Sequence, residues 1–81
     1  MANVTIRNKK YDPENLPVTK GDKVTWTNAD PMVHTVTADN GTFDSGDLAH
    51  NGTFSQTFNQ TGAVPYYCKK HAGMKGTITV T

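Results

Sequence analysis

The sequence predicts an all-β fold, and three observations support this prediction. Apolar and polar residues alternate in short segments, β-branched and aromatic side chains are frequent in those segments, and glycine or proline interrupts them. Alternation with a period of two turns one face of a strand toward a core and the other toward water. No segment of ten residues places apolar side chains at the helical period of 3.6. Roughly seven short strands separated in this way are typical of a sandwich or a barrel.

The alternation recurs along the whole chain. The apolar positions are, in order, Val4 and Ile6, Val24 and Trp26, Val36 and Ala38, Phe54 and Phe58, and finally Ile78 and Val80. Each pair marks a strand, because these residue types fit a pleated, half-buried surface and β-branched side chains lose rotamers in a helix. The strands around the last loop are expected over 64–68 and 75–81. Turn signals suited to hairpins occur at Lys20-Gly21-Asp22, Asn40-Gly41, Asn51-Gly52 and Thr61-Gly62.

The length and charge of the chain exclude several classes of protein. The 81 residues are expected to form one domain, 1–81, without a linker or a repeat. Eight basic and seven acidic residues give a net charge of +1, whereas nucleic-acid-binding domains carry a basic excess. No apolar run approaches the roughly 20 residues of a membrane-spanning helix. The single cysteine excludes an internal disulfide, a redox-active dithiol and zinc sites with several thiolates.

Three potential metal ligands are close together near the C-terminus. Cys68, His71 and Met74 are each separated from the next by two residues, between the two last expected strands. A loop can turn all three side chains toward one point, which a strand cannot do because alternate side chains face opposite ways. His34 is a fourth candidate, because it shares a face with Val36 and therefore points inward at the start of its strand.

Together, these four residues describe a particular kind of copper site. Two imidazoles and a thiolate in a trigonal plane, with a weak axial thioether, are the ligands of a blue-copper electron-transfer centre. Taken singly, each residue has a more ordinary interpretation: a buried cysteine is usually a small hydrophobic residue, and a lone methionine usually packs in a core. The combination favours the metal site. His50 and Met32 lie in turn contexts and are not expected to be ligands.

Several segments of the chain resemble a known family. They are residues 21–28, His34-Thr35-Val36, Phe43-Asp44-Ser45-Gly46, residues 53–55, and the loop that contains Tyr66-Tyr67-Cys68, His71, Met74, Lys75 and Gly76. On these residues the chain resembles the cupredoxins, the small type 1 blue copper proteins of the plastocyanin, amicyanin and pseudoazurin type. The two residues between His71 and Met74 are similar to the amicyanin spacing. Thr35 and Lys69-Lys70 depart from the family pattern, in which Asn follows the first His and Pro occurs in the loop.

The resemblance implies a fold, a cofactor and a function. It implies a Greek-key β-sandwich of seven or eight strands that binds one copper ion through His34, Cys68, His71 and Met74. The function implied is one-electron transfer between redox partner proteins, without enzymatic activity. It also implies a monomer in the periplasm or another extracytoplasmic space, in a mature form whose signal or anchor is not in this chain. Phe43, Tyr66, Pro31 and Met32 are expected around the copper.

The resemblance further implies where partners dock. The edge of His71 would reach the surface through an apolar patch formed by Pro31, Met32, Ala72 and Gly73. Lys69, Lys70 and Lys75 would flank this patch and steer an acidic partner. The alternative is that these lysines only solvate the loop.

Two other functions remain open from the sequence. A module that stores or delivers copper could use the same four donors. An enzyme could pair Cys68 as a nucleophile with His34 or His71, but nothing in the chain resembles an oxyanion hole.

Overall fold

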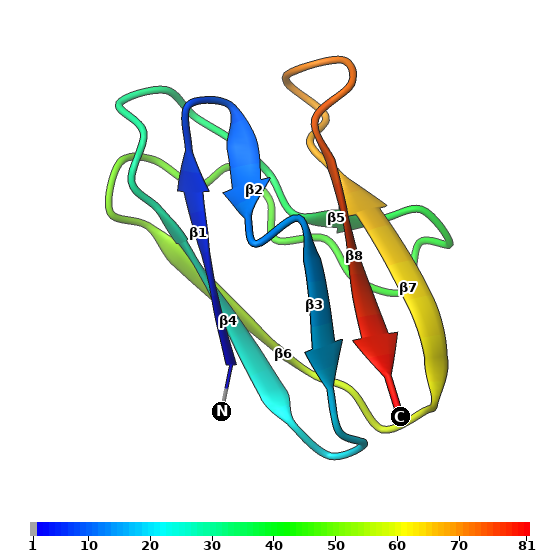
Figure 1. The fold of residues 1–81 in the computed structure, drawn as a ribbon. Coiled ribbons are helices and arrows are strands. Elements are labelled where there is room, and N and C mark those ends of the chain that lie inside the picture. Colours follow the sequence, from blue (N-terminus) through cyan, green and yellow to red (C-terminus); the bar gives the residue numbers. More distant parts are fainter. Residues whose placement is uncertain (1) are drawn as a thin grey trace.

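The computed structural model describes residues 2–81 and contains eight strands in two four-stranded sheets (Figure 1). The first sheet has the order β2-β1-β4-β6 and the second β3-β8-β7-β5. The strands are β1 (Ala2–Arg7), β2 (Lys10–Asp12), β3 (Asn15–Val18), β4 (Lys23–Asn28), β5 (Thr37–Ala38), β6 (Thr53–Thr57), β7 (Gly62–Tyr67) and β8 (Lys75–Val80). The predicted all-β sandwich is confirmed. No helix among the described residues could cross a membrane.

Parallel and antiparallel pairs are mixed in both sheets. β1 is parallel to β4, and β3 is parallel to β8. The other pairs, such as β7 with β8, are antiparallel. The chain changes sheets at each of the five connections from β2 to β7. These crossings bring the end of β7 close to the segment between β4 and β5, where the predicted ligands lie.

The predicted turns are present, but only one of the four folds the chain back beside the strand that precedes it. The Lys20-Gly21-Asp22 turn joins β3 to β4, and Thr61-Gly62 leads from β6 into β7; in both cases the two strands belong to different sheets. Asn40-Gly41 and Asn51-Gly52 both lie in the connection between β5 and β6. After Asn40-Gly41 the chain returns antiparallel to β5: Thr37 pairs with Asp44, and the Ala38 amide donates to the Phe43 carbonyl over 2.9 Å. Turn residues predict that the chain reverses direction, but they do not predict which strand the next segment pairs with. The tight hairpin between two strands is β1–β2, whose turn residues Asn8 and Lys9 have φ of 54° and 58°.

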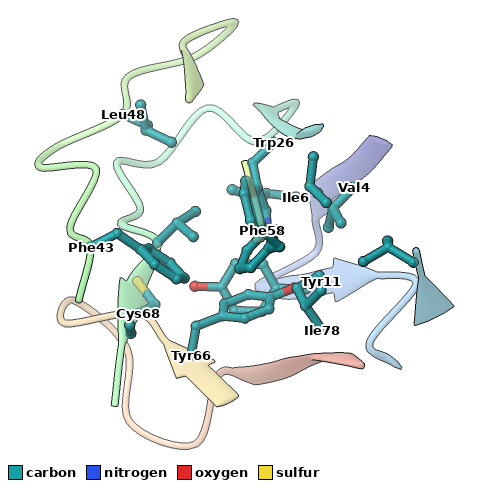
Figure 2. Close-up of a cluster of buried hydrophobic side chains, with 14 of the residues drawn as sticks. Val4, Ile6, Tyr11, Trp26, Phe43, Leu48, Phe58, Tyr66, Cys68 and Ile78 are labelled. Atoms are coloured by element: carbon teal, nitrogen blue, oxygen red, sulfur yellow. The ribbon is translucent and has the colours of Figure 1, made fainter. Parts of the chain in front are cut away.

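The core lies between the sheets and is centred on aromatic side chains. Trp26 is fully buried and its ring lies 5.4 Å from that of Tyr66 and 6.1 Å from that of Phe43 (Figure 2). Cys68 belongs to the same buried cluster. A side chain at Gly76 would place its Cβ 2.5 Å from the Tyr66 hydroxyl, so only glycine allows β8 to pass this ring. The ligand loop therefore begins and ends next to a closely packed part of the core.

Residues 34–38 differ from the expected half-exposed strand. All five are buried, and only Thr37–Ala38 pair as a strand, β5. The β5–β6 connection and the ligand loop cover the threonines that were expected to meet water: Asp44 accepts the Thr37 hydroxyl (3.2 Å), and the Thr35 hydroxyl accepts the Lys69 amide (2.9 Å). His34 also exchanges two backbone hydrogen bonds with Leu48 of that connection. The threonines of this segment consequently make hydrogen bonds inside the protein.

Candidate metal centre

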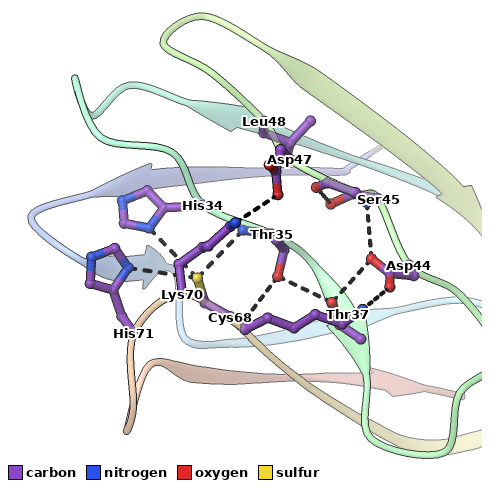
Figure 3. A network of polar contacts seen from close by, with 12 residues as sticks. His34, Thr35, Thr37, Asp44, Ser45, Asp47, Leu48, Cys68, Lys70 and His71 are labelled. Carbon is purple, nitrogen blue, oxygen red and sulfur yellow. Dashed lines mark hydrogen bonds and ion pairs between the residues drawn. The ribbon is translucent and has the colours of Figure 1, made fainter.

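Three of the four predicted ligands converge on one point. The Cys68 Sγ lies 3.7 Å from Nδ1 of His34 and 3.8 Å from Nδ1 of His71 (Figure 3). The donor atoms of these three residues all lie within 4.8 Å of one another. Cys68 directly follows β7, His71 lies in the β7–β8 loop, and His34 comes from the connection between β4 and β5. The sandwich thus brings together donors that are 34 residues apart in sequence.

The spacing of these atoms fits a trigonal metal site. Metal bonds of about 2.3 Å to sulfur and about 2.0 Å to nitrogen, at 120° to each other, separate the two donor atoms by about 3.7 Å. The two observed separations, 3.7 Å and 3.8 Å, match this value. A soft thiolate with two imidazoles is a donor set suited to copper. The residues present therefore fit a copper ion.

Met74 occupies the end of the same loop. Its side chain is buried, with 4% exposed. The Cys68 amide donates a hydrogen bond to the Met74 carbonyl (3.0 Å), and the Met74 amide donates to the His71 carbonyl (3.3 Å). These bonds close the loop and keep the fourth predicted ligand beside the other two that the loop carries.

Thr35 holds the cysteine from the other side. Its amide donates a hydrogen bond to the Cys68 Sγ over 3.4 Å, a contact that fixes the position of the sulfur. Its hydroxyl accepts a hydrogen bond from the Lys69 amide over 2.9 Å. Thr35 departs from the family's usual Asn at this position, and here it fastens the first-ligand segment to the ligand loop.

Asp30 is a functional residue that the sequence reasoning missed. Its Oδ2 lies 2.7 Å from Nε2 of His34, and its carboxylate also accepts the amides of Asn8 (2.7 Å) and Lys9 (2.9 Å). Burial acts to raise the pKa of Asp30, but the hydrogen bonds from Lys9, His34 and Asn8 outweigh it and hold the pKa below its usual value. An ionised Asp30 keeps the His34 proton on Nε2 and leaves Nδ1 free for a metal. The only hint of this role in the sequence is that Asp30 precedes His34 by four residues.

Asn28 orders the backbone between Asp30 and His34. It is fully buried at the end of β4. Its amide group donates to the carbonyls of Met32 (2.8 Å) and Leu48 (2.7 Å), and its oxygen accepts the Asp30 amide (2.9 Å). A polar residue on the buried face of a predicted strand is the signal that could have identified it.

The centre is shielded except on the His71 side. His34 and Cys68 are 0% and 3% exposed, whereas His71 is only half-buried. Pro31, Met32, Ala72 and Gly73, the residues of the expected apolar patch, are all exposed. His50 is exposed as predicted and is not among the described donors grouped at this centre. Of the expected surrounding residues, Phe43 and Tyr66 are buried, while Pro31 and Met32 lie on the surface.

Two of the three loop lysines are paired with acidic residues. Lys69 forms an ion pair with Asp44, and Lys70 with Asp47 at 3.3 Å. The hydrogen bond from Lys69 lowers the pKa of Asp44, and the same bond raises the pKa of Lys69. Both acids lie in the β5–β6 connection. The charge available for steering is therefore smaller than the sequence predicted.

Curated relatives share this sequence over most of its length. Amicyanin from Paracoccus denitrificans is 34% identical over 95% of this chain, which covers 63% of that protein, less than two thirds of its length. Plastocyanin from Scenedesmus fuscus is 32% identical over 86% of this chain and 85% of its own length.

Solved structures share the fold. A Cu(I) structure of an amicyanin mutant superimposes with a TM-score of 0.93 at 29% identity, covering 99% of this chain and 81% of that one. A purple cupredoxin from Nitrosopumilus maritimus gives a TM-score of 0.93 at 32% identity and covers 100% of both chains. Residues 2–81 also match the family model described as copper binding proteins, plastocyanin/azurin family. The chain belongs to this family of copper-binding cupredoxins.

Proposed function

We propose that the protein carries single electrons between redox partner proteins, with one copper ion held by His34, Cys68, His71 and Met74. The observation that carries this proposal is the triangle of donor atoms, whose 3.7 Å and 3.8 Å separations suit a trigonal ligand plane. When bound, copper supplies the one-electron step between Cu(II) and Cu(I). No substrate is converted, so the protein is a carrier and not an enzyme.

The protein's own residues keep the site in one geometry. Asp30 fixes the ring of His34, and the Thr35 amide and the closed ligand loop fix the thiolate. Neither oxidation state then requires these side chains to move, which lowers the reorganisation that accompanies electron transfer. Burial of His34 and Cys68 excludes water from the ligands.

His71 is the proposed electron port. It is the least buried of the three clustered donors, and the exposed Pro31, Met32, Ala72 and Gly73 supply the apolar patch around it. Lys69, Lys70 and Lys75 contribute positive charge nearby, reduced by the pairs with Asp44 and Asp47. On the family resemblance, we propose that this carrier is a monomer and works in the periplasm or another extracytoplasmic compartment.

Electron self-exchange tests the proposal against copper storage or delivery. Mixtures of the Cu(I) and Cu(II) forms are examined by NMR line broadening, and copper removal by a chelator is timed in parallel. A carrier should exchange electrons rapidly and release copper slowly, because the site is closed and needs little rearrangement. Slow exchange together with rapid loss to the chelator would instead identify a storage or delivery module.

A further inference from the structure

A groove of about 520 Å³ lies between the β1–β2 hairpin and the ligand loop. One wall is formed by residues 9–11 together with Glu14, and the other by residues 70–75. Both the hairpin turn and the ligand loop project from the same end of the sandwich (Figure 1). His71 is part of the lining, so the groove reaches the least buried ligand of the metal centre.

The lining of this groove is strongly basic. It contains Lys9, Lys10, Lys70 and Lys75 against the single carboxylate of Glu14. Lys70 is paired with Asp47, but the other three lysines form no ion pair among residues 2–81. Two of these unpaired lysines, Lys9 and Lys10, come from the hairpin and not from the ligand loop. The unneutralised charge near His71 is therefore gathered on the groove side.

Both walls of the groove are held in place before any partner binds. The Lys9 amide donates to Asp30, which also holds His34, and the Tyr11 hydroxyl donates to the Thr35 carbonyl over 2.6 Å. The opposite wall is closed by the hydrogen bonds between Cys68, His71 and Met74. A preformed groove loses little conformational freedom on binding, which favours a specific complex over loose attraction.

We propose that this groove binds a carboxylate-rich segment of the redox partner protein, an inference that rests on the electron-transfer function proposed above. Acidic side chains would be matched by the unpaired Lys9, Lys10 and Lys75. The bound segment would lie against His71, so docking would bring the partner's surface to the electron port. Complementary charge of this kind also raises the association rate and makes it depend on salt.

The test uses a hexaglutamate peptide and the Cu(I)-loaded protein. Amide signals in ¹⁵N–¹H NMR spectra are followed during a peptide titration, at low and at high salt. Perturbations are expected at residues 8–11 and 70–75. The double variant Lys9→Glu/Lys10→Glu is compared with Lys20→Glu/Lys23→Glu, which makes the same change in net charge. Lys20 and Lys23 flank the β3–β4 turn, at the end of the sandwich remote from the groove (Figure 1).

The groove variant should bind the peptide at least about tenfold more weakly than the control variant, because two attractions become two repulsions. The bound peptide should also slow the oxidation of Cu(I) by hexacyanoferrate(III), since it covers His71. Equal weakening in both variants, or perturbations away from the groove, would overturn the inference. Binding to phosphatidylglycerol vesicles but not to the peptide would overturn it as well, in favour of a membrane surface.

The same samples separate this inference from the function on which it rests. If the groove variant behaves like its control while both still cycle between Cu(II) and Cu(I) with small redox reagents, only the docking site is wrong. If the unmodified protein fails to cycle, the electron-transfer function itself is wrong.

Discussion

The Asp30 carboxylate connects His34 to the β1–β2 hairpin. It accepts two backbone amides from the hairpin turn and lies 2.7 Å from Nε2 of the histidine. A negative charge at this distance makes the imidazole a better donor to Cu(II) than to Cu(I). Asp30 is therefore a positioning residue that also favours the oxidised state.

Replacing this carboxylate should change both the potential and the stability. In Asp30→Asn we expect the reduction potential to rise by roughly 60 mV, a tenfold shift of the one-electron equilibrium. The free energy of unfolding should fall by about 1–3 kcal/mol, because two amides lose a charged acceptor. Voltammetry and urea unfolding measure the two effects. Asp47→Asn is the control, because it removes the same charge from an exposed side chain. If the reduction potential of the Asp47→Asn variant rose as much as that of Asp30→Asn, the role of Asp30 would be refuted.

The Thr35 hydroxyl can be tested separately from the size of its side chain. Thr35→Val leaves the Lys69 amide without its acceptor, whereas Thr35→Ser keeps the hydroxyl. We expect Thr35→Val to lower the free energy of unfolding by about 1–2 kcal/mol and to speed copper loss to a chelator. Thr35→Ser should lose copper to the chelator at nearly the same rate as the parent protein. Identical behaviour of the two variants would show that the hydrogen bond does not hold the loop.

At the scale of elements, the ligand loop is fastened to the β5–β6 connection through Asp44. This carboxylate pairs with Lys69 and accepts the Gly46 amide (2.9 Å) and the Thr37 hydroxyl (3.2 Å). Three segments consequently meet on one side chain: the ligand loop, β5 and the connection that follows it. The hydrogen bond from Lys69 is the main cause of the lowered pKa of Asp44.

The lowered pKa predicts a pH window for this attachment. Because the folded-state pKa lies below the usual value near 4, the stabilising effect of Asp44 is complete above about pH 5. It is lost as the pH falls through the folded-state pKa. The stability difference between the parent and Asp44→Asn, measured by urea unfolding, should be constant above pH 5 and shrink below pH 4. Asp39→Asn is the control of equal charge. A difference that grows on acidification would contradict the attachment.

Strands could be predicted where alternation alone decides the structure. Val24 and Trp26 alternate with polar residues and lie inside β4 as expected. Residues 34–38 show the limit of this rule, because the long connection that buries their second face is not visible in a period of two. The Asn8–Lys9 hairpin turn was also missed, since lysine rarely signals a left-handed conformation.

Over the whole molecule, the sequence predicts the donor set more completely than its surroundings. Cys68, His71 and Met74 form a local pattern, and His34 follows from its inward face. The hydrogen bonds of Asp30 and the pairing of Lys69 with Asp44 depend on segments distant in sequence, so no local pattern reveals them. Which lysines form ion pairs, and which keep their charge free to attract a partner, likewise becomes visible only in the folded structure.

The metal centre also has a structural consequence for a chain of 81 residues. Small domains bury a limited share of their surface, so their cores contribute little excess stability. A copper ion shared by His34 and Cys68 would join the β4–β5 connection to the end of β7, two parts of the chain that are 34 residues apart. Such a link stabilises the folded state because the unfolded chain does not present the site.

The most direct test of the copper–thiolate centre is the spectrum of the protein with one equivalent of Cu(II). Visible absorption and EPR spectra are recorded for the parent chain and for Cys68→Ala, with circular dichroism to verify that both are folded. We predict an intense visible charge-transfer band in the parent, caused by the thiolate, and its loss in Cys68→Ala. A parent spectrum with only weak copper absorption, or an equally intense band in folded Cys68→Ala, would contradict the account.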